Sequence, residues 1–343
     1  MKPATLSPSR VRAILAAAAK TRVLVIGDVM LDHFIWGRVG RISPEAPVPV
    51  VDFDRESFIP GGAANVARNL TALQMPTELF GVVGRDAPAT HLKRLLLEHK
   101  IGCTGLLANG RRFTSVKTRI VAHQQQVVRL DRETRAELDE QTTNRLLSAL
   151  ASKLSGVAAV IIGDYGKGVV SQPLLEEIKH LCRRHGVWLS MDPKPVHHLD
   201  LRELSLITPN RKETFELAGM PDETRHSNPL SDHNLMQAVD KLLLELKPVI
   251  LLITLGELGM LLCRAGQKPF HIPTQAKEVF DVSGAGDTVI ASFTLAIAAG
   301  ASPVEAAILS NHAAGIVVGK VGTAIVTPPE LLASFNHQSR PSR

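Results

Sequence analysis

The chain has 343 residues, of which 45% are apolar, so it can bury a sizeable core and is not disordered as a whole. Aromatic residues make up only 4% of it, which favours an aliphatic core of β-strands covered by Ala- and Leu-rich helices over a β-sandwich. The formal net charge is +6, but the basic residues are scattered and form no run of like charges, which excludes the usual pattern of a nucleic-acid-binding surface.

An apolar stretch at residues 11–19 predicts a short amphipathic helix within an N-terminal extension over residues 1–20. The stretch is too short and too weakly apolar to span a membrane, and no convincing signal-peptide cleavage site follows it. The three cysteines lie far apart and form no C-x-x-C pair, which argues against a zinc module and a disulfide framework. We therefore expect a cytoplasmic protein without a membrane partner.

Short β-branched strands recur along the chain, and each ends in a turn rich in Gly, Asp, Asn or Pro. They are predicted at residues 22–26, 157–162, 187–191, 204–208 and 249–254. Helical patterns lie between them, at residues 87–99, 139–154, 173–185 and 235–246. Strands that alternate with helices predict an α/β fold with a doubly wound, mainly parallel sheet, whose functional residues lie at the carboxyl ends of the strands.

Two stretches, at residues 34–59 and 111–130, break this rhythm because they alternate in hydrophobicity and contain no long helical pattern. We predict that they form a small β-sheet lid on a single domain that covers residues 21–335. The lid has an exposed face and edge, so we expect it to pair with a second copy and form a homodimer. Residues 336–343 are polar and are expected to be a tail.

The sharpest motif is the stretch at residues 281–288, Asp-Val-Ser-Gly-Ala-Gly-Asp-Thr, which leads into a helix of small apolar residues. The turn of Gly284, Ala285 and Gly286 lets the backbone approach an anion, and the positive end of the helix dipole points toward it. Asp287 would be ionised there, and beside a phosphate it could accept a proton from an attacking hydroxyl. Taken alone, a plain helix cap by Asp287 explains the motif equally well.

A second Gly-rich turn, at Gly61 and Gly62, also leads into a helix of small residues. Its backbone donors and the Asn65 amide suit sugar hydroxyls, although glycine pairs before helices are also common packing devices. Asp28 and Asp32 follow the first strand and are further candidates for the sugar site. Their alternative role is to cap the turn that follows the strand.

Asn210 and Glu213 lie one turn apart at a predicted helix start, where they suit phosphate oxygens and the hydration shell of Mg²⁺. A capping box has almost the same spacing, so both interpretations stay open. Thr254, Gly256 and Gly259 form another strand-to-turn element that could shape a nucleotide pocket. A hairpin turn is the competing explanation.

The motifs at residues 61–67 and 284–287, in this order, together resemble the two signatures of the ribokinase/PfkB family of carbohydrate kinases. The resemblance runs from about residue 23 to residue 329. It implies a ribokinase-like fold and a phosphotransferase that uses ATP and Mg²⁺, with Asp287 as the catalytic base and residues 284–286 as the anion hole. It also implies that Asn210 lies near the phosphates, that Glu213 holds Mg²⁺ through water, and that Asn311 lies on the adenine side with Gly256 and Gly259.

Within the family, five segments resemble the bacterial heptose 7-phosphate kinases; they lie at residues 27–32, 41–50, 60–67, 125–131 and 273–279. This likeness implies phosphorylation of D-glycero-β-D-manno-heptose 7-phosphate at O1, on the way to the ADP-heptose of lipopolysaccharide. The substrate phosphate would need cations, for which Lys117, Arg119, Arg129 and Lys167 are candidates, although such side chains are often only solvated. Such relatives often carry a nucleotidyltransferase domain, and we expect a kinase without it.

Two other interpretations stay open: another sugar or nucleoside kinase of the same family, and a non-catalytic sensor of sugars or nucleotides on the same fold. The chain contains neither a G-x-G-x-x-G after its first strand nor a P-loop motif. His197, His198 and His312 lack partners at metal-ligand spacing, so structural or surface roles are expected for them. The small residues around 281–288 are compatible with a K⁺ loop, but none of them requires one.

Overall fold

The computed structural model describes residues 6–123, 125–194, 197–276 and 278–336. Residues 1–5 of the predicted extension and residues 337–343 of the predicted tail lie outside this range. The main sheet has nine strands in the order β13-β12-β11-β10-β9-β8-β1-β4-β5. These strands are β1 (Val23–Gly27), β4 (Thr77–Val83), β5 (Gly102–Ala108), β8 (Ala159–Gly163), β9 (Trp188–Asp192), β10 (Leu206–Ile207), β11 (Ile250–Thr254), β12 (Met260–Cys263) and β13 (Phe270–Ile272).

The sheet is parallel from β5 to β11, and β12 and β13 are antiparallel additions at one edge. Alternate residues of the central strand β1 enter two separate cores, because successive side chains of a strand point to opposite faces. Val23 and Val25 pack in one core, and Leu24 and Ile26 in the other. A mainly parallel sheet buried on both faces confirms the doubly wound α/β prediction.

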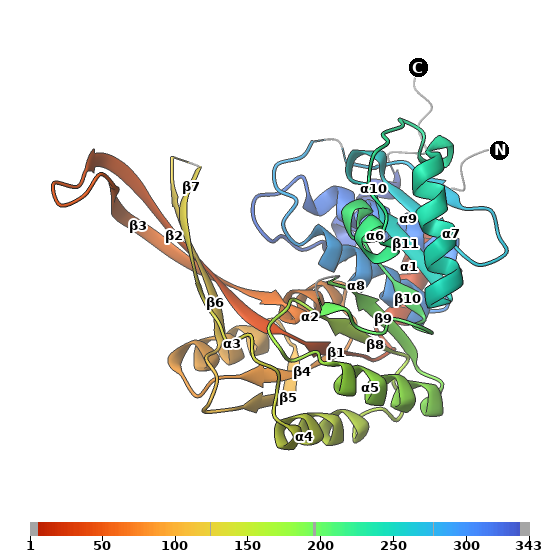
Figure 1. Ribbon diagram of the computed structural model, residues 1–343, viewed down its shortest axis with the longest axis horizontal. Coiled ribbons are helices and arrows are strands. Elements are labelled where there is room, and N and C mark those ends of the chain that lie inside the picture. Colours follow the sequence, from red (N-terminus) through yellow and green to blue (C-terminus); the bar gives the residue numbers. More distant parts are fainter. Residues whose placement is uncertain (1–5, 124, 195–196, 277, 337–343) are drawn as a thin grey trace.

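Helices cover both faces of the sheet (Figure 1). The core that contains Val23 is completed by α1 (Pro8–Ala18), α2 (Ala63–Ala72), α3 (Ala87–Glu98), α8 (Ala285–Ala298), α9 (Pro303–Val317) and α10 (Pro328–Asn336). The core that contains Leu24 is completed by α4 (Glu140–Ala151), α5 (Gln172–His185), α6 (Arg211–Ala218) and α7 (His233–Leu246). Within the described residues, no helix is long and apolar enough to cross a membrane.

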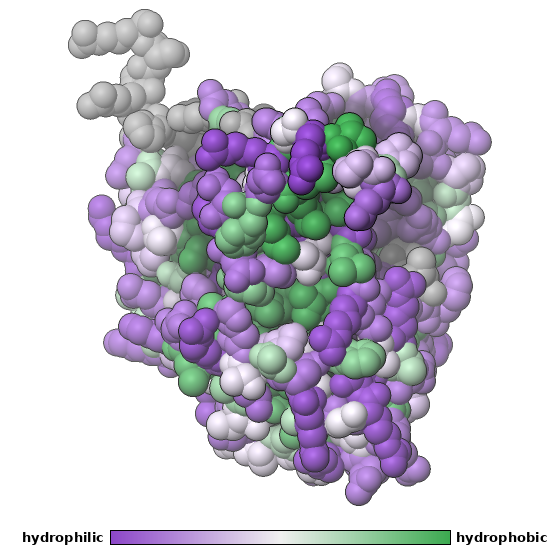
Figure 2. All heavy atoms as spheres, turned by 90° about the vertical axis from the view of Figure 1, so that its left-hand side faces the viewer, coloured by the Kyte–Doolittle hydropathy of each residue, from purple (hydrophilic) through white to green (hydrophobic). Residues whose placement is uncertain are grey.

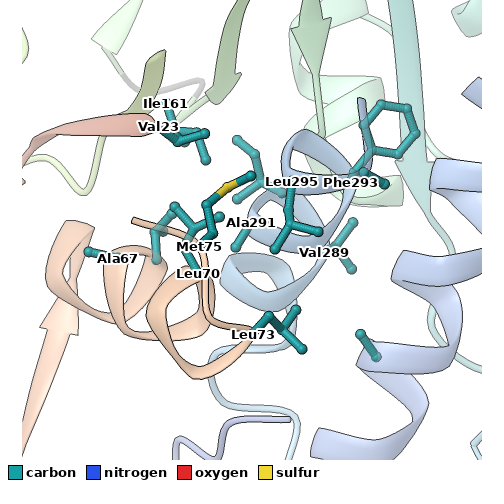
Figure 3. Close-up of a cluster of buried hydrophobic side chains, with 14 of the residues drawn as sticks. Val23, Ala67, Leu70, Leu73, Met75, Ile161, Val289, Ala291, Phe293 and Leu295 are labelled. Carbon is teal, nitrogen blue, oxygen red and sulfur yellow. The ribbon is translucent and has the colours of Figure 1, made fainter. Parts of the chain in front are cut away.

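Helices α2 and α8, which begin at the two Gly-rich motifs, pack against each other (Figure 3). Leu70 and Ala67 of α2 and Val289 and Ala291 of α8 are all buried in this contact region. Helix α8 is apolar on all sides because it lies inside the molecule, between α2 and α9. The packing brings the N-terminal ends of α2 and α8 to the same place.

A second sheet has the strand order β3-β2-β6-β7 and projects from the main body (Figure 1). Its strands are β2 (Val29–Ile42), β3 (Pro49–Gly62), β6 (Ser115–Ala122) and β7 (Gln125–Arg132). Large apolar side chains on it are exposed, among them Ile42, Phe53, Val128 and Leu130. Figure 2, which views the molecule from this side, shows apolar residues gathered in the middle of the face and hydrophilic residues around them.

The predicted helices match α3, α4, α5 and α7 to within a few residues at each end. The strand predicted at residues 204–208 is shorter in the structure, where β10 has only two residues. Ser205 and Thr208, on either side of it, still donate backbone hydrogen bonds to β9. Pro209 follows without an N–H group and cannot donate to a neighbouring strand, although its carbonyl accepts from the Thr254 N–H of β11 at 3.0 Å. The strands β4, β5, β12 and β13 were not predicted.

Candidate active site

The first strand and its neighbour β8 both end in glycine, and their backbones touch there. Gly27 pairs with Gly163 in the parallel ladder, and the Asp28 N–H donates to the Gly163 carbonyl at 3.0 Å. A Cβ on Gly27, whose φ is 152°, would lie 2.0 Å from the Gly163 oxygen, so no larger residue fits. This close approach places Asp28 beside the loop that follows β8.

The Asp28 carboxylate is 1% exposed and accepts three backbone hydrogen bonds from that loop. Its Oδ2 accepts from the N–H groups of Tyr165 at 2.9 Å and Lys167 at 3.0 Å, and its Oδ1 accepts from Val169 at 3.0 Å. We call residues 164–169 the Tyr165 loop. These bonds fix the loop after β8, whereas the sequence had suggested for Asp28 a cap of the turn after its own strand or a contact with a sugar.

Gly284 caps the N-terminus of α8 with a left-handed backbone, φ 78°. A Cβ there would lie 2.7 Å from Thr323 Cγ2 and 2.8 Å from Asn65 Nδ2. The turn therefore needs glycine both for its conformation and for its space. The Ala285 N–H, which was predicted to belong to the anion hole, donates to the Val282 carbonyl at 3.2 Å. The N–H groups of Gly286 and Asp287 have no partner within the helix and face its N-terminal end, which suits an anion.

Asp287 lies in the first turn of α8 and is 9% exposed. Asn65 Nδ2 donates to its Oδ2 at 2.6 Å, and the Tyr165 hydroxyl donates to its Oδ1 at 2.5 Å. Burial raises the pKa of the Asp287 carboxyl, while the hydrogen bonds from Asn65 and Tyr165 and the charge of Lys194 act in the opposite direction. The two predicted motifs thus meet at one carboxylate.

Further hydrogen bonds from polar side chains of α2 and α8 fix the surroundings of Asn65 and Asp287. Thr288 Oγ1 donates to Asn69 Oδ1 at 2.9 Å, and Asn69 Nδ2 donates to the Asn65 carbonyl at 2.9 Å. Arg68 donates to the carbonyl of Thr323. Burial lowers the pKa of Arg68 to about 10, which leaves it charged at neutral pH.

Lys194, which follows β9, is a cation between two carboxylates at the same edge of the sheet. Its Nζ lies 2.8 Å from Glu213 Oε1 and 3.7 Å from Asp192 Oδ2. Burial raises the pKa of the Asp192 carboxyl to about 7. Burial would lower the pKa of Lys194, but the two carboxylates outweigh it and raise that pKa.

Known proteins resemble this chain over most of its length. The model of the pfkB family carbohydrate kinases matches residues 20–330. The chain belongs to this family. It is therefore an ATP-dependent sugar kinase, and the family implies ATP and a divalent metal ion as its requirements.

Two curated relatives carry the name bifunctional protein HldE. The one from Desulfatibacillum aliphaticivorans is 42% identical over 317 residues, which cover 92% of this chain and 63% of the relative. The one from Geotalea uraniireducens is 39% identical over 327 residues, which cover 95% of this chain and 65% of the relative. The chain thus spans just under two thirds of the length of these relatives.

Solved structures of the family share the fold at low sequence identity. Phosphofructokinase-2 from Escherichia coli, solved in complex with potassium, superimposes with a TM-score of 0.76 at 19% identity, over 93% of this chain and 100% of that chain. Arabidopsis thaliana ribokinase, complexed with ribose and ATP, gives a TM-score of 0.71 at 19% identity, over 92% and 98%. At this identity the likeness supports the fold assignment of this pfkB-family kinase.

Asn210 and Glu213 form the capping box that the sequence allowed. Asn210 Oδ1 accepts from the Glu213 N–H at 2.9 Å, and Glu213 Oε2 accepts from the Asn210 N–H at 2.9 Å. Among the residues that the structure describes, no cluster of three or more Asp, Glu, His or Cys side chains is placed to hold a metal ion. A single carboxylate such as that of Glu213 nevertheless suits Mg²⁺, because this ion keeps several waters and takes further ligands from substrate phosphates.

The cations predicted for the substrate phosphate lie partly together. Arg119 Nη1 pairs with Asp32 Oδ1 at 2.6 Å, and Lys167 Nζ pairs with Glu133 Oε2 at 2.6 Å. Burial, followed by the positive charge of Lys167, lowers the pKa of Lys117. Lys117, Arg119 and Lys167 therefore form a basic group between the second sheet and the Tyr165 loop.

The remaining predicted residues occupy other positions. Arg129 on β7 is half exposed and pairs with Asp131 at 2.9 Å. Gly61 and Gly62 end β3, and Gly62 caps α2, so the backbone of both glycines lies beside the site. Asn311 of α9 donates from Nδ2 to the carbonyl of Pro273 at 2.7 Å.

Thr254 ends β11, and Gly256 and Gly259 form the turn to the antiparallel strand β12. This turn is the hairpin that the sequence left as an alternative to a nucleotide pocket.

His197 Nδ1 lies 3.0 Å from Asp164 Oδ2, and His312 stacks on a phenylalanine ring in the core.

Sequence reasoning missed Tyr165, Lys194 and Asp192. Tyr165 lies in a Gly-rich loop after β8 that matches no phosphate-binding motif, so no spacing marks it as functional. Asp192 and Lys194 follow a predicted strand, so the rule that sites lie at the carboxyl ends of parallel strands would have found them.

Proposed function

We propose that this kinase transfers the γ-phosphate of ATP to O1 of D-glycero-β-D-manno-heptose 7-phosphate and forms the 1,7-bisphosphate. This reaction would take place in the cytoplasm, on the way to the ADP-heptose of the lipopolysaccharide inner core. The observation that carries the proposal is the buried Asp287 carboxylate at the N-terminus of α8, within 2.6 Å of the Asn65 amide. The resemblance of five segments to heptose 7-phosphate kinases and the HldE relatives support the choice of sugar.

In the proposed reaction, Asp287 accepts the proton of the O1 hydroxyl while that oxygen forms its bond to the γ-phosphorus. The bond from the γ-phosphorus to the bridging oxygen breaks, and ADP leaves. The N–H groups of Gly284, Gly286 and Asp287 face the transferring phosphoryl group and stabilise its negative charge, while the Ala285 N–H, which donates to the Val282 carbonyl, helps to fix the turn. Mg²⁺ would neutralise further phosphate charge. Glu213 would hold this ion through its water ligands, and Asn210 would lie beside the phosphates.

The other parts of the proposal concern the two ligands. Asp28, Asp32, Gly61, Gly62 and Asn65 border the sugar. The basic group of Lys117, Arg119 and Lys167, with Arg129 farther along the second sheet, takes the 7-phosphate. Thr254, Gly256, Gly259 and Asn311 border the nucleotide. The lid at residues 34–59 and 111–130 closes over the sugar and excludes water, so ATP hydrolysis without sugar should be slow.

Product analysis tests this function directly. The enzyme is incubated with ATP, Mg²⁺ and heptose 7-phosphate, and the product is identified by ³¹P NMR and mass spectrometry, with ribose, fructose 6-phosphate and adenosine as competing acceptors. We expect the 1,7-bisphosphate and little turnover of the other acceptors. Preferred turnover of another acceptor would instead assign the chain to a different sugar or nucleoside kinase of the family. Assays in KCl and NaCl test whether residues 281–288 form a K⁺ loop.

Asp287→Asn keeps the shape of the side chain and removes the base. Loss of general acid–base catalysis should lower the rate about 10²–10⁴-fold while ATP binding persists. A rate near that of the wild type would refute the assignment of Asp287 as the base.

We also propose a homodimer that forms through the second sheet. Ile42, Phe53, Val128 and Leu130 are 50–68% exposed on it, and burying such side chains stabilises an interface. Leu130→Lys should shift the molar mass measured by light scattering from dimer to monomer. Leu244→Lys, at a 75% exposed position on α7, serves as the matched control and should leave the dimer intact. A Leu130→Lys variant that remains dimeric would contradict this interface.

A further inference from the structure

The Tyr165 loop connects three parts of the site. Asp28, at the end of β1, accepts the N–H groups of Tyr165, Lys167 and Val169, and so fixes the backbone of this loop. The Tyr165 side chain then reaches Asp287, and its hydroxyl donates to Oδ1 at 2.5 Å. The other carboxylate oxygen is held by Asn65 at 2.6 Å.

We propose that Tyr165 is a positioning residue of this kinase, whose hydroxyl holds the Asp287 carboxylate ionised and in one orientation, ready to accept the proton of the sugar hydroxyl. This inference rests on the proposed function, because it takes Asp287 as the base. Each carboxylate oxygen has two lone pairs, so the bonds from Tyr165 and Asn65 leave room for the sugar hydroxyl.

Tyr165 can act only as a donor here. Burial, and then the charges of Asp287 and Asp192, raise the pKa of its hydroxyl well above the usual value. The hydroxyl therefore stays protonated through the working pH range. The sugar proton goes to Asp287, and Tyr165 keeps its own proton throughout the reaction.

The ionisation of Asp287 is decided by opposing neighbours. Burial raises its pKa and is opposed by the bonds from Asn65 and Tyr165. The titratable and charged groups that act on it from the surrounding elements are Asp32 of β2, Arg68 of α2, Tyr165 after β8, Asp192 of β9 and Lys194 after β9. Removing the hydroxyl takes away one of the two direct bonds to the ionised form, so the pKa of Asp287 must rise.

Tyr165→Phe tests the proposal through the pH dependence of kcat/KM for the sugar. A hydrogen bond to a charged group corresponds to about one to two pKa units, so the acid limb should move up by about that amount, with little change in the rate at high pH. Thr294→Val is the matched control, because it removes a buried hydroxyl of α8 that contacts Ser190 at 2.8 Å. Its acid limb should stay in place. An acid limb that stays in place in Tyr165→Phe as well, whatever happens to the overall rate, would overturn the proposal.

A second measurement needs no Tyr165 variant, because Tyr165 is the only tyrosine in the sequence. Tyrosine labelled with ¹³C at Cζ gives one protein resonance, which should shift with the same apparent pKa as the kinetic acid limb. The shift should vanish in Asp287→Asn. A wild-type resonance that does not respond across the acid limb would overturn the proposal even if Tyr165→Phe did not fold.

The two levels of the argument fail separately. Normal activity of Asp287→Asn would refute the proposed base and, with it, the role of Tyr165, while the choice of substrate is decided by the product analysis. An inactive Asp287→Asn, combined with an unshifted acid limb in Tyr165→Phe, would leave the function standing and refute only the role of Tyr165.

Discussion

Asp28 offers a test of whether the site is held by its loop. Asp28→Ala removes the acceptor of three backbone N–H groups at 2.9–3.0 Å, in a place where the carboxylate is 1% exposed. An unsatisfied buried donor costs about 1–3 kcal/mol, and water can reach part of the half-buried loop, so we expect a loss of about 3 kcal/mol in the free energy of unfolding. For a chain of this length the unfolding entropy is about 0.7 kcal/mol per degree, which corresponds to a fall in Tm of about 4 °C.

Thermal and urea unfolding measure this loss, and Asp28→Asn, which keeps one acceptor oxygen, should show about half of it. Because the loop carries Tyr165, both variants should also raise the acid limb of the pH–rate profile. A variant Asp28→Ala with wild-type stability would refute the reasoning. A higher KM for the sugar in both variants would in addition support the proposed place of Asp28 beside the sugar.

Three further predictions follow from the same geometry. Gly284→Ala should lower kcat about 10²-fold, because the new Cβ would lie 2.7 Å from Thr323 and displace the turn of backbone amides. Steady-state kinetics measure this loss of kcat, and unfolding curves show whether the variant is still folded. Asn65→Ala should raise KM for the sugar more than KM for ATP; equal losses would tell against the sugar placement. Burial lowers the pKa of His312 to about 4, below the value of 6.5 that it has in the unfolded chain. The free energy of unfolding is therefore fully present above pH 6.5 and falls by about 3 kcal/mol as the pH is lowered toward 4, because the unfolded chain binds the proton more readily. Urea unfolding at pH 7 and pH 4.5 should show a steeper loss in the wild type than in His312→Phe.

The fold was predictable because its signals are local. The parallel strands β1, β8 and β9 are short, mostly apolar runs that end at a glycine or an acidic residue, and the predicted helices α3, α4, α5 and α7 repeat their apolar positions with the helical period. Strands that are defined mainly by their pairing with neighbours could not be predicted from the sequence. The strand β10 is two residues long, and β4, β5, β12 and β13 are defined by the neighbours they pair with more than by their own pattern.

The site was predictable only in part, for the same reason. The Gly-rich turns at residues 61–62 and 284–286 are local features, and the helices that follow them bring Asn65 and Asp287 into contact. Which side chain reaches that carboxylate depends on the path of the Tyr165 loop, and this path is set by Asp28 on another strand. No spacing in the sequence encodes such a contact between two loops.

A buried base creates a conflict that the described contacts resolve. In the proposed reaction, closing the lid removes water, and the loss of water raises the pKa of Asp287 just when the residue must be ionised to accept a proton. Donors fixed by the protein do not leave with the water, so the bonds from Asn65 and Tyr165 persist in the closed site. The two donors come from α2 and from the Tyr165 loop, and neither can shift without a change in the main sheet or its helices. We therefore attribute to the rigidity of the fold the ability of the proposed base to be both buried and ionised.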